Sequence, residues 1–141
     1  MPAAAPRSWV LDTSALFCLK EDEPGAQAVE NILRDHGGAG RVFVSFMSLM
    51  EYCYVLHQER GEAAARRGYL ELRQLPLQVI ESDEELGLAA ARIKGKTRLS
   101  VADAWIAATA QRLGAALVHK DPEFEPLKEI LTLHPLPYKS R

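Results

Sequence analysis

The 141-residue sequence is poor in cysteine. It contains only Cys18 and Cys53, which lack the paired spacing of a zinc site. Both fall in segments expected to be helical, so we interpret them as reduced, buried thiols of a cytoplasmic protein. There is no apolar run of membrane-spanning length. The stretch from Met1 to Pro6 lacks the positively charged region and apolar region of a signal peptide. These absences favour a cytoplasmic protein with no membrane association.

Neither positive nor negative charge dominates, because the chain has 17 basic and 19 acidic residues and a net charge of −2. A nucleic-acid partner would therefore have to be met by a local basic patch. Internal repeats, low-complexity segments, linkers and a phosphate-binding glycine loop are all missing from the sequence. With 48% hydrophobic residues, the chain is expected to form one domain over 1–141, with 1–7 and 136–141 as loose ends.

What the sequence does contain is a regular alternation of short apolar runs and helical segments. This alternation predicts an α/β fold with a mainly parallel sheet of four or five strands and right-handed crossovers. Residues 100–113 are typical of a helix that Ser100 caps and Gly114 ends. Ser82 with Glu85 predicts another capped start, and Ser45 or Ser48 a third. The expected strands are 8–11, 41–44, 77–80, 115–118 and, as a possible fifth, 130–133.

Asp103 is unusual because it begins an apolar face that continues with Ile106, Ala107 and Ala110. An unpaired charge on such a face is costly. One interpretation is an anion that the helix N-terminus stabilises, and the other is a metal ligand.

Three further acids are expected at the same edge of the sheet, because the carboxyl ends of parallel strands meet there. Each has a simpler explanation. Asp12 can cap a helix, Glu51 can close a capping box with Ser48, and Asp121 can start a turn before Pro122. All four acids together favour a site. They are Asp12, Glu51, Asp103 and Asp121.

Crowded carboxylates need a cation to neutralise them, and oxygen ligands alone select a hard ion such as Mg²⁺ or Mn²⁺. The chemistry that this implies is phosphodiester hydrolysis by a water that the metal activates.

The motifs resemble those of a PIN-domain ribonuclease of the VapC toxin type over about residues 9–133. The matching segments are 10–14, Glu51, 99–104 with 106–110, and 117–121 with Phe124. The resemblance implies a three-layer α/β/α sandwich and RNA cleavage that depends on one or two Mg²⁺ or Mn²⁺ ions. It also implies a homodimer and a cognate antitoxin that blocks the site.

By position, the resemblance assigns the three core acidic roles to Asp12, Glu51 and Asp103, and the fourth, more variable one to Asp121. The family usually has Thr or Ser two residues before the fourth acid, where this chain has His119. That departure leaves Glu123 as an alternative fourth acid. His119 itself is expected to be a packed or hydrogen-bonding strand residue.

Several other residues are possible contributors. Thr13 or Ser14 would either hydrogen-bond a metal-bound carboxylate or cap a helix. Lys96 and Arg98 would hold RNA phosphates or form a solvated loop. Apolar segments 26–33 and 47–56 are candidate dimer surfaces.

Two alternative functions remain open at this point. One is a non-catalytic RNA-binding protein of the PIN fold. The other is a Mg²⁺-binding phosphoacceptor receiver-like domain, which normally needs adjacent acids after the first strand, whereas Asp12 is flanked by Leu11 and Thr13.

Overall fold

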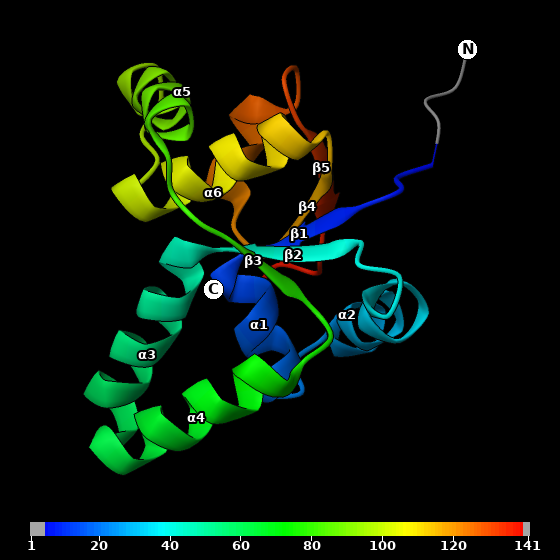
Figure 1. The fold of residues 1–141 in the computed structure, drawn as a ribbon, viewed down its shortest axis with the longest axis vertical. Coiled ribbons are helices and arrows are strands. Elements are labelled where there is room, and N and C mark those ends of the chain that lie inside the picture. The colour runs from blue at the N-terminus through cyan, green and yellow to red at the C-terminus, as the bar shows by residue number, and fades with distance from the viewer. Residues whose placement is uncertain (1–4, 140–141) are drawn as a thin grey trace.

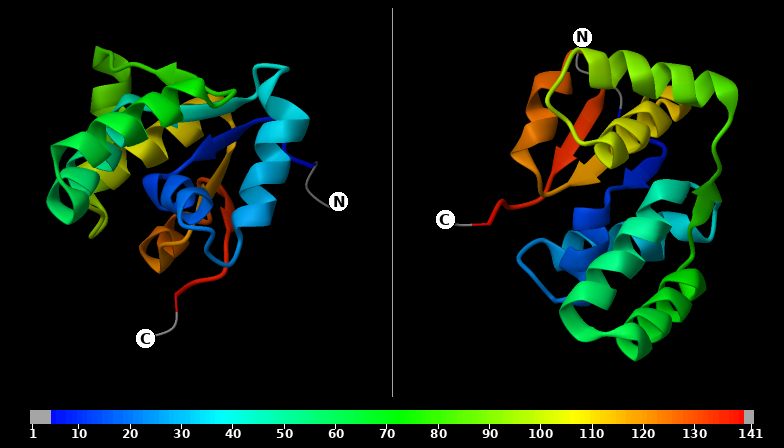
Figure 2. Two further views of the ribbon diagram at one scale, coloured as in Figure 1. Left: turned by 90° about the horizontal axis from the view of Figure 1, so that it is seen from below. Right: turned by 90° about the vertical axis from the view of Figure 1, so that its left-hand side faces the viewer.

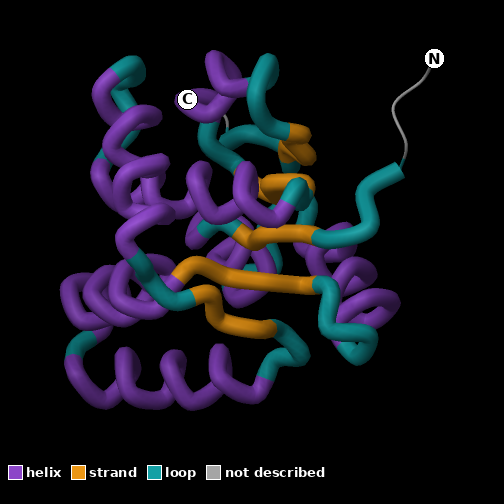
Figure 3. Tube along the Cα trace, turned by 45° about the horizontal axis from the view of Figure 1, so that its top comes forward, coloured by secondary structure: helices purple, strands orange, loops and turns teal. Residues whose placement is uncertain are grey.

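A five-stranded parallel sheet forms the centre of the computed structural model, which describes residues 5–139 (Figures 1 and 3). The strand order is β3-β2-β1-β4-β5, and all neighbouring pairs are parallel. The predicted α/β class is confirmed, and the possible fifth strand is present two residues later than expected. The strands are β1 Trp9–Leu11, β2 Val42–Ser45, β3 Gln78–Ile80, β4 Ala116–His119 and β5 Thr132–Pro135.

Helices cover both faces of the sheet, as Figure 1 and the two views of Figure 2 show, and this confirms the three-layer arrangement. Successive side chains of β1 point to opposite faces of the sheet, so Trp9 and Leu11 pack into one apolar core and Val10 packs into the other. Burying a large aliphatic side chain in such cores contributes about 1.5–3 kcal/mol. One face carries α1 Thr13–Lys20, α2 Ala26–Ile32, its π-helical extension η1 Leu33–Gly37, α3 Phe46–Arg60 and α4 Glu62–Gln74. The other carries α5 Glu84–Gly95, α6 Val101–Leu113 and the 3₁₀ helix η2 Pro122–Leu127.

The chain changes direction across the sheet at β1. It passes from β1 to β2 on one side, and it later returns to place β4 on the other side of β1. In open α/β sheets this switch point is where ligands bind, beyond the carboxyl ends of the strands. Among residues 5–139, no helix combines the length and apolar character needed to cross a membrane.

The predicted start of α5 is wrong in its capping residue. Asp83, rather than Ser82, is the N-cap, and its Oδ1 accepts the backbone N–H of Leu86 at 2.8 Å. The guanidinium of Arg112 on α6 also donates to both oxygens of Asp83, at 2.6 and 2.7 Å. A tertiary contact between α5 and α6 therefore holds the capping side chain.

One residue of the expected loose end 136–141, Leu136, packs against the fold. The side chain of Leu136 is buried, and its backbone N–H donates to the carbonyl of His119 at 2.7 Å. The pairing of β5 with β4 places Leu136 against the core. Residues 140–141, and residues 1–4 of the other expected loose end, lie outside the described part of the chain.

A close backbone approach at Gly37 yields a testable prediction. A Cβ at Gly37 would lie 2.5 Å from the carbonyl oxygen of Pro76, in the segment that leads into β3, whereas a Cβ at Gly38 would meet nothing within 4 Å. We expect Gly37→Ala to lower the free energy of unfolding by about 1–3 kcal/mol, because backbone must move. Gly38→Ala is the matched control and should change it little. Urea unfolding measures both, and equal stability of the two variants would contradict the prediction.

Candidate active site

A cleft of about 550 Å³ opens at the carboxyl edge of the sheet, beside the end of β1. All four acids that the sequence singled out line it. Of these four, Asp103 and Asp121 belong, with Glu123, to a group whose carboxylate oxygens lie within 4.8 Å of one another, and Asp12 and Glu51 do not. The cleft also has basic side chains, which the sequence interpretation did not single out. The full lining is Asp12, Thr13, Ser14, Phe17, Glu21, Glu23, Glu51, Val55, Glu59, Arg60, Asp103, Lys120, Asp121 and Lys139.

Asp12 directly follows β1 at the carboxyl edge of the sheet and is only 3% exposed. It is the N-cap of α1, and its Oδ2 accepts the backbone N–H of Ser14 at 3.1 Å and the Ser14 hydroxyl at 2.5 Å. Its other oxygen, Oδ1, is buried and has no hydrogen-bond partner among residues 5–139. Capping therefore accounts for one carboxylate oxygen of Asp12 and leaves the second without a structural role.

Two hydroxyls hold the surrounding elements in place. The Ser14 hydroxyl accepts the backbone N–H of Lys120 at 3.0 Å, which joins α1 to the end of β4. The Thr13 hydroxyl donates to the Ser48 hydroxyl at 3.0 Å, which joins the starts of α1 and α3. Neither Thr13 nor Ser14 is the N-cap, so the capping alternative for them is wrong, and Ser14 directly orients the Asp12 carboxylate.

Glu51 projects from the second turn of α3. The structure rejects its alternative explanation as part of a capping box with Ser48, because Ser45 is the N-cap and accepts the N–H of Met47 at 3.1 Å. The Oε1 atom of Glu51 is buried and has no hydrogen-bond partner in the described range 5–139. Like Asp12, this side chain brings an unpartnered oxygen to the cleft.

Asp103 lies in the first turn of α6. Ser100 caps that helix by accepting the N–H of Asp103 at 3.1 Å. Carboxylate oxygens of Asp103, Asp121 and Glu123 lie within 4.8 Å of one another. Asp121 lines the cleft and accepts the N–H of Glu123 at 2.9 Å, whereas the Glu123 side chain is exposed. Both acids considered for the fourth role therefore lie next to Asp103.

Burial and crowding raise the pKa of two of these carboxyl groups. The pKa of Asp103 rises to about 8, first because of burial and then because of the charges of Asp12, Glu51 and Asp121, while the nearby Ser100 hydroxyl opposes the rise. The pKa of Asp12 rises to about 6, mainly because of burial, although the hydrogen bonds from Ser14 oppose it. The site therefore disfavours its own full ionisation unless a cation enters.

The donor set fits a divalent metal ion. It consists of carboxylate oxygens, two of which, Asp12 Oδ1 and Glu51 Oε1, are buried without a partner among the described residues. Hard cations such as Mg²⁺, Mn²⁺ and Ca²⁺ take ligands of this kind. The buried unpartnered oxygens are the feature that a purely structural role for these acids does not explain.

His119 is fully buried in β4 and does not line the cleft. Its Nδ1 accepts the backbone N–H of Asp121 at 3.2 Å, and its ring packs against Phe124 with centroids 5.2 Å apart. Burial lowers the pKa of His119, although the nearby acids Asp121 and Glu125 oppose this. The imidazole thus acts as a hydrogen-bonding strand residue beside Asp121, as expected.

The structure does not bring Lys96 and Arg98 into the cleft. Both are exposed in the α5–α6 loop and neither is among the lining residues. Contact with RNA phosphates outside the cleft stays a prediction for these two residues.

Three basic residues of the cleft were missed, and the topology explains where they come from. Lys120 follows β4 directly, so it lies at the same edge as Asp121. Lys139 follows β5, which is parallel to β4 and ends at that edge too. Arg60 is the last residue of α3, on the opposite face of the helix from Glu51, and it reaches the cleft through an ion pair with Glu21. The rule that located the acids therefore also applies to Lys120 and Lys139, but not to Arg60.

The fold and the cleft together define a class of protein, a parallel α/β domain with clustered carboxylates at the switch point of its sheet. The chain belongs to the PIN domain family, whose model matches residues 9–130. The predicted family is thus confirmed, and a receiver-like domain is excluded. A search of curated protein sequences gave no significant match.

Solved structures with the same fold include several toxin–antitoxin complexes. A chain of VapBC2 from Rickettsia felis, bound to a promoter DNA fragment, superposes with a TM-score of 0.70 at 17% identity, over 92% of this chain and 98% of that one. DNA-bound VapBC from Salmonella typhimurium has a TM-score of 0.69 at 19% identity, over 91% of this chain and 97% of that one. Mycobacterium tuberculosis VapC20, described as a sarcin-ricin loop cleaving toxin, has a TM-score of 0.67 at 17% identity, over 84% of this chain and 94% of that one.

The raised pKa values predict how stability depends on pH when metal is removed. A carboxyl whose folded pKa exceeds its unfolded value stabilises the fold below the unfolded pKa and loses that contribution as pH rises. The stabilising contribution of Asp103 is lost between its ordinary pKa of 3.8 and its folded pKa of about 8, and that of Asp12 between 3.8 and about 6. We expect the melting temperature in EDTA to fall between about pH 5 and about pH 8.5, and Asp103→Asn to remove most of that fall.

The matched control is Glu129→Gln, which changes an exposed acid outside the cleft and should leave the pH dependence as in wild type. A wild-type melting temperature that rises over this range would contradict the prediction. So would an Asp103→Asn variant that keeps the full pH dependence.

Proposed function

We propose that the protein is a Mg²⁺- or Mn²⁺-dependent endoribonuclease, the toxin of a type II toxin–antitoxin pair. The observation that carries this proposal is the pair of buried, unpartnered oxygens, Asp12 Oδ1 and Glu51 Oε1, in a cleft shared with Asp103 and Asp121. Membership of the PIN family supports it, as does the similar fold of a toxin described as cleaving the sarcin-ricin loop.

Asp12, Glu51, Asp103 and Asp121 would hold one or two metal ions. When bound, the metal supplies a water of lowered pKa and neutralises charge on the phosphate. Hydrogen bonds from Ser14 hold the Asp12 carboxylate against the end of β4. The four acids would keep water, rather than the ribose 2′-hydroxyl, as the nucleophile, so the products should carry 5′-phosphate and 3′-hydroxyl ends.

We further propose that a cognate antitoxin binds this chain and that both act in the cytoplasm. The support is that similar folds occur in structures of VapBC complexes, including two that are bound to DNA. The free thiols of Cys18 and Cys53 suit a reducing compartment.

The Asp103→Asn substitution tests the metal site. If Asp103 is a ligand, cleavage of RNA with Mn²⁺ should fall by orders of magnitude, because a neutral amide is a weaker ligand. In EDTA the variant should melt at or above the wild-type temperature, because like-charge repulsion is relieved. Mn²⁺ at about 100 times its Kd should stabilise wild type by about 2.7 kcal/mol and the variant much less. Melting curves and a cleavage assay on the same preparations measure these effects.

Other outcomes would refute the assignment. If Asp103 only stabilises a helix N-terminus, the substitution should cost about 0.3–1 kcal/mol and leave cleavage intact. Wild-type cleavage that survives EDTA, or that leaves 2′,3′-cyclic phosphates, would rule out metal-activated water. Wild-type RNA binding without any cleavage would favour a non-catalytic RNA-binding protein.

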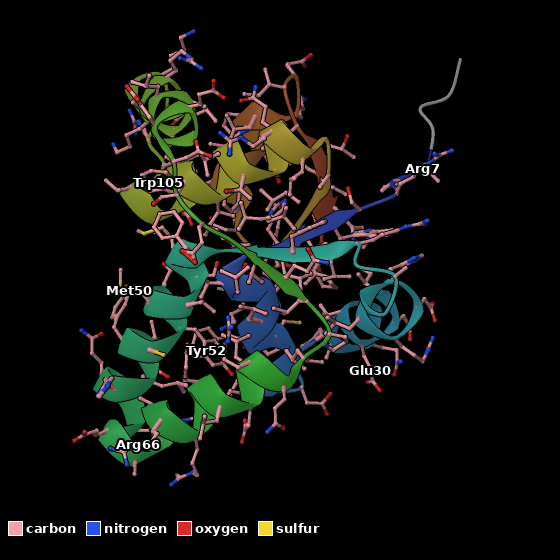
Figure 4. The ribbon with its side chains drawn as sticks, in the orientation of Figure 1. Arg7, Glu30, Met50, Tyr52, Arg66 and Trp105 are labelled. Atoms are coloured by element: carbon pink, nitrogen blue, oxygen red, sulfur yellow. The ribbon has the colours of Figure 1, made fainter. Side chains whose placement is uncertain are left out.

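We also propose that the protein forms a homodimer. The candidate surface over residues 26–33 is wrong, because its apolar side chains Ala26, Val29, Ile32 and Leu33 are buried in the core. The candidate on α3 remains open. Figure 4 shows Met50 on the outer side of this helix and Tyr52 on the side toward α1, and Met50 and Tyr54 are 53% and 43% exposed.

A Met50→Glu, Tyr54→Glu double variant tests this surface. A charge on each of these two side chains should prevent apolar burial between copies and leave a monomer. Leu88→Glu, at a residue of α5 that is 55% exposed, is the control and should keep the wild-type state. Sedimentation velocity at micromolar concentration measures all three, and a wild type that is already monomeric would contradict the proposal.

A further inference from the structure

The C-terminal tail runs along the rim of the cleft. It begins after β5, at the edge of the sheet that carries the acids. Its first residue, Leu136, donates its backbone N–H to the His119 carbonyl. It then passes close to the turn between α1 and α2, where a Cβ at Gly25 would lie 3.0 Å from Cδ of Pro137. Leu136 and the path beside Gly25 therefore direct the tail so that Lys139 lines the cleft.

One carboxylate there holds two lysines. Lys139 Nζ lies 3.0 Å from Glu23 Oε2, and Lys120 Nζ lies 3.3 Å from Glu23 Oε1 and 3.0 Å from the carbonyl of Pro24. Partial burial raises the pKa of Glu23, but the bonds from Lys139 and Lys120 outweigh it and hold the pKa below its ordinary value. A single ionised carboxylate, that of Glu23, therefore pairs with two ammonium groups.

The two lysines differ in exposure and in the number of their partners. The side chain of Lys120 is 4% exposed and bonds to both Glu23 and Pro24, whereas that of Lys139 is 73% exposed and bonds only to Glu23 among the described residues. An ion pair whose ammonium group lies in solvent contributes little to stability. Lys139 can therefore exchange Glu23 for another anion at little cost, while Lys120 stays in place.

We propose that Lys139 and Lys120 form a phosphate subsite for the RNA backbone at this rim. The inference rests on the proposed ribonuclease function and names where the substrate's charge is met. Seven carboxyl groups and three basic groups line the cleft, so a polyanion needs cationic contacts there besides the metal. A phosphate that reaches Lys139 replaces Glu23 as its partner, with Lys120 supplying fixed positive charge beneath it.

The experiment measures binding of a single-stranded RNA oligonucleotide with Ca²⁺ in place of Mn²⁺, from about 50 to about 200 mM salt. Lys139→Gln should weaken binding several-fold and reduce the slope of log affinity against log salt by about 0.7, the value for one phosphate contact on a single strand. Lys139→Arg should restore both, because its cation still reaches a phosphate. Lys128→Gln, at an exposed residue outside the cleft, is the control and should bind as wild type does.

Three results would overturn the subsite. One is a wild-type slope in Lys139→Gln, above all if a Lys96→Ala, Arg98→Ala variant loses slope instead, because the phosphates would then be held at the α5–α6 loop. Another is an equal loss in Lys128→Gln, which would mean unspecific surface charge. A wild type that neither binds RNA with Ca²⁺ nor cuts it with Mn²⁺ overturns the proposed function and the subsite with it. If wild type cleaves RNA, the first of these results overturns the subsite and leaves the proposed function in place.

Discussion

The crowding of carboxylates at the ends of parallel strands is the constraint on which the rest of this structure depends. Asp12 follows β1, where the chain switches sides of the sheet, and α3 and α6 bring Glu51 and Asp103 to the same cleft. Burial makes this proximity costly, as the raised pKa values of Asp12 and Asp103 show. The fold tolerates it because the surrounding helices and strands are held by two large apolar cores on the two faces of the sheet.

The polar contacts around these acids position the carboxylates without neutralising them. Ser14 donates to Asp12 and accepts from the backbone after β4, so one hydroxyl connects the Asp12 carboxylate to the neighbouring strand. The Thr13–Ser48 bond does the same for the starts of α1 and α3. Two cations of the cleft, Lys120 and Lys139, pair with Glu23 instead of with the four acids. Asp12 Oδ1 and Glu51 Oε1 have no hydrogen-bond partner among residues 5–139.

Local sequence patterns predicted most elements well and failed where several residues offered the same local chemistry. Ser45 and Ser48 are both good caps, and Ser45 is the N-cap, whereas the Ser48 hydroxyl bonds to Thr13. Ser82 and Asp83 are also equivalent by pattern, yet Arg112 on another helix selects Asp83. In each case a contact with a residue distant in the sequence decided between local states that differ by about 1 kcal/mol or less.

The sequence by itself determined the alternation of strands and helices, the family, and the convergence of Asp12, Glu51, Asp103 and Asp121 on one edge. It could do so because periodicity is local and parallel strands share their carboxyl edge. Only the tertiary structure decided that Asp12 and Glu51 keep a buried, unpartnered oxygen each, that residues 26–33 face the core, and that the tail brings Lys139 to Glu23. Those features depend on side-chain distances across the fold, and no local pattern encodes such distances.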